Sequence, residues 1–187
     1  VGFYYYQKIG HSERQVALKE AIRTFDAPVG EGSSQFLKSF PTEEEKDAAV
    51  QKEFDSLIKE HSGSDEAMIA TFYLGVDDVN KGNITDAESQ FRKVAESAGK
   101  VWASQAKLSL AQLYLGEGKT ADAEKLLQDL IDNPTILVTK EQAIIELARA
   151  IAKKDPARAR EMLEPLRTER GPVSRAALTA LGEISQN

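Results

Sequence analysis

The chain has 187 residues, 41% of them hydrophobic and 29% charged, which is ordinary for a globular protein long enough to bury a core. Its net charge of −6 argues against a nucleic-acid binder, because such proteins need a basic face to displace counterions from phosphate. The sequence has no cysteine, which excludes disulfides, thiolate catalysis and cysteine-ligated zinc.

Residues 1–6, VGFYYY, are rich in tyrosine, which is common where a membrane span meets the lipid headgroups. Two interpretations stay open: the end of a span that lies upstream of Val1, or the start of a helix that packs on itself. The printed sequence has no run of 18 apolar residues and therefore predicts no span of its own. A first helix is expected over 3–25, because apolar residues from Val16 to Phe25 recur at helical spacing.

Turn-forming residues over 26–34, DAPVGEGSS, cannot continue that helix and predict a flexible linker. The next helix is expected to begin after Thr42, whose side chain can cap it while Glu45 completes a capping box. The acids that follow Thr42 favour the positive end of the helix dipole. The turn residues of HSGS, at 61–64, end this helix.

From residue 65 onward the pattern predicts pairs of helices. They are expected over 65–80 and 85–97, over 100–116 and 120–132, over 140–153 and 156–168, with a last helix over 172–184. Gly82 and Gly118 lie where a left-handed turn residue is needed. Helix caps are expected from Thr85 with Glu88, from Thr139 with Gln142 and from Asp155 before Pro156, and Pro165 is expected to bend or end its helix. No strand pattern is present.

The segment 74–96 recurs at 110–132, a shift of 36 residues. The shared columns are a large residue followed by a small one, a glycine in the turn and an alanine in the second helix; they hold Leu74, Gly75, Gly82 and Ala87, matched by Leu110, Ala111, Gly118 and Ala123. Phe91 and Val94 are matched by Leu127 and Leu130, and a further 36 residues on the last three apolar columns continue at Ala159, Leu163 and Leu166. A constant period in this range signals stacked helical hairpins, so the sequence predicts an all-α fold.

Over residues 65–170 these columns resemble the tetratricopeptide repeat. The resemblance implies a right-handed α–α superhelix of tetratricopeptide-like helical hairpins. It also implies N-terminal helices and a linker over 1–62, followed by a repeat array with a C-terminal capping helix over 63–187. Small residues such as Gly75 and Ala111 would let two helix axes approach closely. Arrays of this kind usually bind other proteins.

In that family the first helices of successive hairpins line a concave groove. The resemblance nominates as partner-binding residues Ile69, Phe72, Val76, Val79, Gln105, Leu108, Gln112, Leu115, Gln142, Ile145 and Arg149, with Ala152 at the end of the third hairpin's first helix. The helix at 65–80 is apolar nearly all round and needs cover on both faces. Two sources of cover stay open: the chain's own helices at 3–25 or 43–60, or an amphipathic helix or extended segment of a partner.

No pattern in the sequence predicts catalysis, a metal or a cofactor. GEGKT, at 116–120, lacks the first glycine of a phosphate-binding loop, since Leu113 stands there, and it lies between two helices rather than after a strand. His11 and His61 are the only histidines, and their spacing fits no metal-binding motif. We therefore expect a protein that is not an enzyme and that carries no cofactor and no metal.

The N-terminal half resembles a narrower group. Residues 1–27 and 54–75 look like the segments that follow the membrane span in bacterial inner-membrane proteins with a periplasmic tetratricopeptide-like domain, such as the ancillary subunit of the SecYEG translocon. His61, Ser62 and Gly63 stand where that group has tyrosine, proline and glycine.

This narrower resemblance implies a non-catalytic adaptor at the periplasmic face of the inner membrane, anchored by a span upstream of Val1. Its partners would be proteins of the translocon, periplasmic folding factors or envelope components; a cytoplasmic location is the alternative.

A second hypothesis is a self-associating structural module. Residues 26–66 contain eleven acidic residues and four lysines, whereas residues 140–175 have a small excess of basic residues. The acidic segment of one copy could therefore pair with the basic segment of another to form a homo-oligomer.

Overall fold

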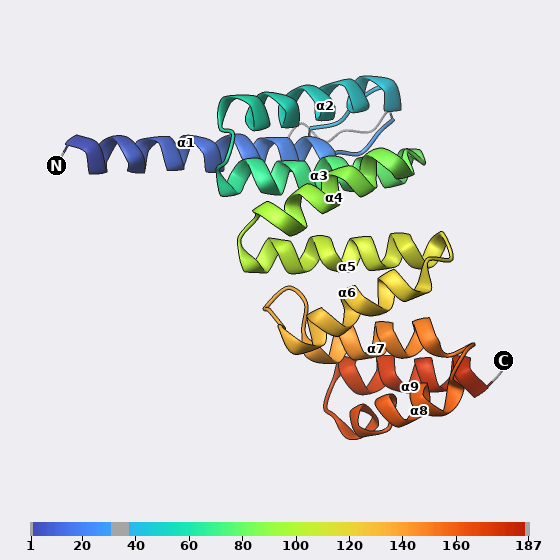
Figure 1. Cartoon of the computed structure of the whole chain (residues 1–187). Helices are drawn as coiled ribbons and strands as arrows, with labels where there is room; N and C mark the ends of the chain where they lie inside the picture. The colour runs from blue at the N-terminus through green and yellow to red at the C-terminus, as the bar shows by residue number, and fades with distance from the viewer. Residues whose placement is uncertain (1, 31–37, 186–187) are drawn as a thin grey trace. The chain divides into compact units, whose positions relative to one another are not determined.

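The computed structural model describes residues 2–30 and 38–185, with side chains from residue 10 onward (Figure 1). In that part of the chain every regular element is a helix, apart from one isolated bridge between Val29 and Phe40. The all-α prediction is therefore confirmed. The contacts gather the chain into two compact units, residues 1–94 and residues 95–187. The domain boundary expected after residue 62 stays a prediction.

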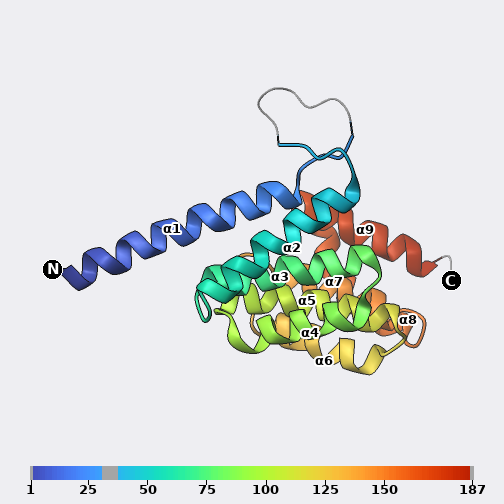
Figure 2. The ribbon, with the colours of Figure 1, turned by 90° about the horizontal axis from the view of Figure 1, so that it is seen from above.

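Unit 1 contains α1 (Gly2–Phe25), α2 (Glu43–Glu60), α3 (Asp65–Lys81) and most of α4 (Ile84–Ser97). Helices α1, α2 and α3 lie side by side and contact one another (Figure 1). The amino-terminal end of α1 projects past α2 and α3 (Figure 2). The side chains of the tyrosine-rich residues 1–6 lie outside the described part of the chain, so both interpretations of that segment stay open.

Local side-chain chemistry sets the ends of these helices. The Thr42 hydroxyl accepts a hydrogen bond from the Glu45 backbone N–H at 3.2 Å, as expected of a helix cap. Ser64 caps α3 in the same way, through the Ala67 N–H at 3.1 Å. Gly82 ends α3 with a φ of +78°, a left-handed conformation that glycine adopts without steric cost.

The cap expected from Thr85 and Glu88 is wrong. Helix α4 begins at Ile84, so Thr85 lies inside its first turn. The helix starts earlier because the Asn83 carbonyl already accepts the Ala87 N–H at 3.0 Å. Glu88 instead pairs with Arg92, one helical turn further on, at 2.5 Å.

The predicted linker over 26–34 is described only up to Gly30; residues 31–34 lie outside the described residues. Hydrogen bonds hold the described part of this segment in place. Gly30 donates to the Phe40 carbonyl at 3.0 Å, and Phe40 donates to the Pro28 carbonyl at 3.1 Å. The Lys38 ammonium donates to the buried Thr24 hydroxyl and, at 2.9 Å, to the Glu53 carboxylate. The connection between α1 and α2 is therefore fastened to both helices.

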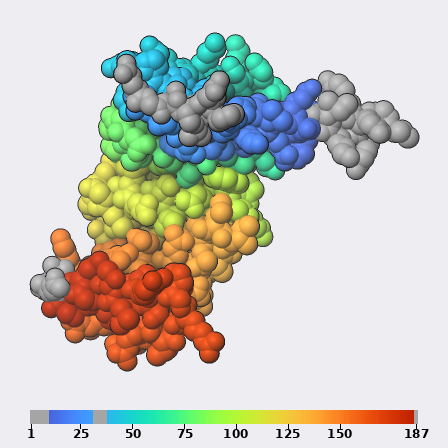
Figure 3. All heavy atoms as spheres, turned by 180° about the vertical axis from the view of Figure 1, so that it is seen from behind, coloured from blue at the N-terminus to red at the C-terminus, as the bar shows by residue number. Residues whose placement is uncertain are grey.

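One face of α3 is buried against α1 and α2. The shared core contains the buried side chains Ala21, Val50, Phe54, Leu57, Ala67, Ala70 and Leu74, with Leu18, Ile22, Phe25, Ile58 and Tyr73 around them. Tyr73 meets Phe25 edge-on at 5.4 Å and stacks on Phe54 at 5.8 Å between ring centroids. Atoms of α1 lie directly against those of α3 in the space-filling view (Figure 3).

Another face of α3 packs on α4 through a very close contact at Gly75. A Cβ built on Gly75 would lie 2.7 Å from the Phe91 ring, closer than real side chains approach. Phe91 is itself 2% exposed, and its ring centroid lies 5.3 Å from that of Phe72. The small residue in the repeat column therefore does what the sequence predicted, which is to let the two helices of the hairpin come together.

A buried carboxylate joins α1 to the start of α3. Glu66 is 4% exposed. Its carboxylate oxygens lie 2.9 Å from Nδ1 of His11 and 3.1 Å from Nε of Arg14. Burial acts to raise the pKa of Glu66, but a backbone hydrogen bond, the hydrogen bond and charge of Arg14 and the charge of His11 together hold that pKa below its usual value near 4.5. Glu66 is therefore ionised in the folded protein at neutral pH.

Unit 2 contains α5 (Lys100–Gly116), α6 (Thr120–Asp132), α7 (Lys140–Ile151), α8 (Pro156–Leu163), a 3₁₀ turn (Pro165–Thr168) and α9 (Pro172–Ser185). The expected caps at Thr139 and Asp155 are present, and Gly118 has the expected left-handed φ of +76°. The helix expected over 156–168 ends at Leu163. Pro165 has no N–H to continue it, and the chain tightens into the 3₁₀ turn.

Replacing Gly75 by alanine tests the contact between α3 and α4. We expect the free energy of unfolding to fall by about 1–3 kcal/mol, because the new methyl group would meet a ring that is packed on all sides. Urea titration followed by circular dichroism measures the change. The matched control is Gly182→Ala in α9, where a Cβ meets no atom within 4 Å and the helix should gain up to about 1 kcal/mol. Equal effects at both glycines would contradict the close contact.

Glu66→Gln tests how α1 is held. Because the folded-state pKa of Glu66 is depressed, its charge contributes stability above the unfolded value near 4.5, and that contribution disappears as the pH falls through the folded-state pKa. The variant should be less stable than the wild type at pH 7, and the difference should shrink as the pH drops below about 4.5. The control is Glu13→Gln at an exposed position of α1, which should leave the free energy of unfolding at pH 7 unchanged. Parallel pH profiles for wild type and Glu66→Gln would refute the ion pair.

Candidate functional site

The nominated residues of α3 lie outside the core that α3 shares with α1 and α2. Phe72 is 7% exposed and contacts the rings of Phe91 and Tyr73, so it belongs to the packing between α3 and its neighbours. Ile69 and Val76 are partly exposed, and Val79 is 40% exposed. The chain's own N-terminal helices therefore cover α3 but leave this line of side chains in reach of a partner.

In unit 2 the nominated residues divide into buried and accessible ones. Leu108 and Ile145 are buried within the helix packing. Gln105 and Leu115 of α5 are partly exposed, as is Ala152 just after α7, and Gln112 and Gln142 are exposed. Arg149 is partly exposed, but its guanidinium pairs with Glu183 of α9 at 3.1 Å and with Glu146 at 3.5 Å. Arg149 therefore fastens the last helix to α7 as well as facing outward.

Three of the accessible residues are glutamines. Gln105 is partly exposed, and Gln112 and Gln142 are exposed, so their side-chain amides are within reach of a partner. Gln105 and Gln112 are two helical turns apart and so share one face of α5. Each amide offers two donors and an acceptor, which suits the polar groups of an extended peptide backbone.

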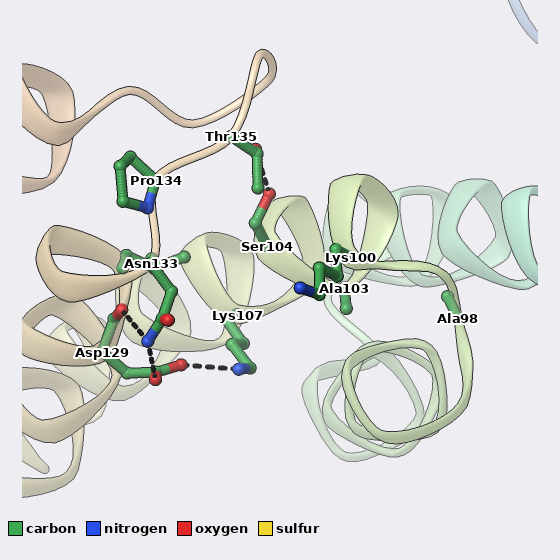
Figure 4. A pocket seen from close by; sticks show the side chains of 10 residues that line it. Ala98, Lys100, Ala103, Ser104, Lys107, Asp129, Asn133, Pro134 and Thr135 are labelled. Atoms are coloured by element: carbon green, nitrogen blue, oxygen red, sulfur yellow. Dashed lines mark hydrogen bonds and ion pairs between the residues drawn. The ribbon is translucent and has the colours of Figure 1, made fainter.

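Unit 2 also has a pocket of about 370 Å³, formed by the start of α5, the end of α6 and the loop that follows α6 (Figure 4). It is lined by Ala98, Lys100, Ala103, Ser104, Lys107, Asp129, Leu130, Asn133, Pro134 and Thr135. None of these residues is among the nominated groove positions. The pocket is thus a second accessible feature of the same unit.

Most polar groups in this pocket satisfy one another. Lys107 of α5 donates to the Asp129 carboxylate of α6 at 2.5 Å, and the Asn133 amide donates to the same carboxylate at 3.0 Å. The hydroxyl groups of Ser104 and Thr135 lie 2.6 Å apart (Figure 4). The network links α5, the end of α6 and the following loop, and it leaves Lys100 as the lining charge with no ion-pair partner in the described part of the chain.

Sequence reasoning did not find this pocket, because its partners lie 22 and 31 residues apart and follow no local pattern. It also missed that His11, although 54% exposed, pairs with the buried Glu66. A turn-forming pair, Asn133 and Pro134, is the one local signal that could have drawn attention to this loop.

A family model for the tetratricopeptide repeat-like domain matches residues 28–135, more than half of the chain. The chain belongs to the tetratricopeptide repeat-like family. The match confirms the broader resemblance over residues 65–135, and it begins upstream of the helical hairpins that carried it; over residues 136–170 the resemblance stays a prediction. Searches of curated proteins and of solved structures returned no match.

Tetratricopeptide repeat-like domains generally mediate protein–protein interactions and are generally not catalytic, so a protein-interaction scaffold is the function class of this chain. Among the residues that the structure describes, no group of histidine and carboxylate side chains is placed to hold a metal ion. Within the same residues, no helix combines the length and the apolarity that a bilayer crossing requires.

Proposed function

We propose that this tetratricopeptide repeat-like protein is a non-catalytic adaptor that recruits other proteins at the periplasmic face of the bacterial inner membrane. A span upstream of Val1 anchors it there. Its partners belong to the translocon, to the periplasmic folding factors or to the envelope assembly machinery. Family membership supports the recruitment of proteins. The resemblance of residues 1–27 and 54–75 to the inner-membrane group supports the location.

The observation that carries the proposal is the set of accessible side chains on the first helices of the hairpins. In unit 2 these are the amides of Gln105, Gln112 and Gln142, with the partly exposed Leu115 on the same face of α5 as Gln105 and Gln112. In unit 1 they are Ile69, Val76 and Val79. Within unit 2, amides that can bond an extended backbone beside an apolar side chain such as Leu115 are an arrangement that suits peptide binding.

Removing the three amides tests the recruitment of partners. The full-length protein, with the proposed upstream residues, is cross-linked to its neighbours in its native cells and purified. The proteins recovered with it are quantified by mass spectrometry and compared with those recovered with the variant Gln105→Ala/Gln112→Ala/Gln142→Ala. Three lost hydrogen bonds at about 1 kcal/mol each weaken binding about 100-fold, so specific envelope partners should be lost from the variant. The control is Gln128→Ala, an exposed glutamine on α6 whose amide is already bonded to Asp132.

Unchanged recovery of every envelope partner by the triple variant would contradict the proposal. So would a stable homodimer at tens of micromolar in sedimentation experiments, if high salt dissociated it. That result would favour the self-associating module, in which acidic residues over 26–66 of one copy pair with basic residues over 140–175 of another.

Reporter fusions test the location. Alkaline phosphatase is active only after export to a compartment where its disulfides form, so fusing it after Asn187 of the full-length protein should give active enzyme. The same fusion lacking the residues upstream of Val1 should be inactive, because nothing would then direct export. Activity of a cytoplasmic reporter, such as β-galactosidase, fused to the full-length protein would instead place the repeats in the cytoplasm.

A further inference from the structure

The loop between α6 and α7 has a fixed shape. The Thr135 N–H donates to the Val138 carbonyl at 2.8 Å, and the Val138 N–H donates back to the Thr135 hydroxyl at 3.1 Å. The Ser104 hydroxyl of α5 holds Thr135 from the side of the pocket, at 2.6 Å. Val138 is fully buried and anchors the far end of the loop. The two residues between these anchors are therefore held in place by their neighbours.

Those two residues, Ile136 and Leu137, form an apolar tip that faces solvent. Ile136 is 86% exposed, the highest value of any large apolar side chain in the described part of the chain, and Leu137 is 39% exposed. Val138 supplies the apolar group that the core needs at this point, so folding does not require Ile136 to be aliphatic. The family match ends at residue 135, so the tip lies just beyond the segment that the family model describes.

The pocket beside the tip has an uncompensated positive charge. Its charged lining residues are Lys100, Lys107 and Asp129. Asp129 pairs with Lys107, and the next acid along α6, Asp132, is not among the residues that line the pocket. Lys100 is exposed, and neither its own element nor the facing loop supplies a counter-ion among the described residues. A ligand that approaches the tip along the pocket therefore meets a free ammonium group.

We propose that the apolar tip and the adjoining pocket form a docking site for a partner segment that has an aliphatic or aromatic side chain next to a carboxylate. The apolar side chain of the partner packs on Ile136 and Leu137, and its carboxylate pairs with Lys100 at the pocket. Burial of apolar surface supplies most of the affinity, and the exposed ion pair selects the sign of the partner's charge. The inference rests on the proposed function in that the ligand is a protein, but it uses none of the glutamines.

A peptide selection tests this site directly. A library of random 12-residue peptides displayed on phage is selected against the full chain, and bound clones are sequenced. Enriched peptides should place Asp or Glu beside Leu, Ile, Phe or Trp. A synthetic copy of the most enriched peptide should bind at least tenfold more weakly to Ile136→Ser/Leu137→Ser. Selection against Lys100→Glu should enrich Lys or Arg instead, a reversal of preference that a merely structural role for Lys100 would not produce.

Two controls separate docking from damage to the fold. Lys153→Glu reverses an exposed lysine elsewhere in the same unit and should leave the enriched peptides unchanged. Leu178→Ser removes a half-exposed apolar side chain from α9, which neither proposed site uses, and should leave the affinity unchanged. The single variant Ile136→Ser should unfold at the wild-type temperature, because a side chain that is 86% exposed contributes little to the core, and it should still weaken peptide binding.

The inference is overturned if no peptide is enriched, if the tip variant binds the enriched peptide as tightly as the wild type, or if Lys100→Glu keeps the acidic preference. It is also overturned if the wild type is a dimer that Ile136→Ser/Leu137→Ser dissociates, because the occupant of the tip would then be a second copy of the chain. Loss of peptide binding in the triple glutamine variant, with the tip variant unaffected, would instead support the proposed groove and refute the tip.

Discussion

The packing of the hairpins depends on small residues buried between their helices. In unit 1 such a residue is Gly75, whose α-carbon leaves no room for a methyl group beside the Phe91 ring. In unit 2 the equivalent Ala111 and Ala148 are fully buried, as are Ala123 and Ala159 of the second helices. Large residues can fill the space on both sides only because these positions stay small, so the close approach of the helices decides which faces remain for binding.

In unit 1 this constraint determines what α3 can offer a partner. One of its faces is taken by Phe91 of α4 and another by the core shared with α1 and α2. The buried Glu66 fixes α1 in place, since a carboxylate removed from water needs its positive partners. What remains accessible is a narrow line of aliphatic side chains. A protein that binds this unit through α3 would therefore contact the side chains that the packing of the helices leaves exposed.

The sequence predicted those parts of the fold that rest on local chemistry. Thr42, Gly82, Gly118 and Asp155 start or end helices for reasons that a few neighbouring residues contain. Thr85 failed as a cap because the helix already begins at Ile84, and local pattern does not decide between starting points one residue apart. The nominated groove residues divided into buried and accessible ones for a similar reason, since exposure depends on helices far away in the sequence. Phe72, Leu108 and Ile145 are apolar members of the nominated set that the structure buries.

Features that join distant segments could not be predicted. The pair of His11 with Glu66 spans 55 residues, and the contact of Ser104 with Thr135 spans 31. In both cases each residue alone is unremarkable as a helix or loop residue, and only the packing of the hairpins brings the two together. The apolar tip at Ile136 and Leu137 was likewise hidden, because a single sequence does not show which apolar residues the fold leaves exposed.

The most direct test of the account is a solution NMR measurement on the Gly75 α-protons. If α3 and α4 approach as closely as described, these protons lie against the Phe91 ring. They should then show strong nuclear Overhauser effects to the ring protons of Phe91 and a ring-current shift to high field. Gly75 α-protons with ordinary helical chemical shifts and no such effects would show that the helices do not meet at this residue, and the packing on which the accessible faces depend would be wrong.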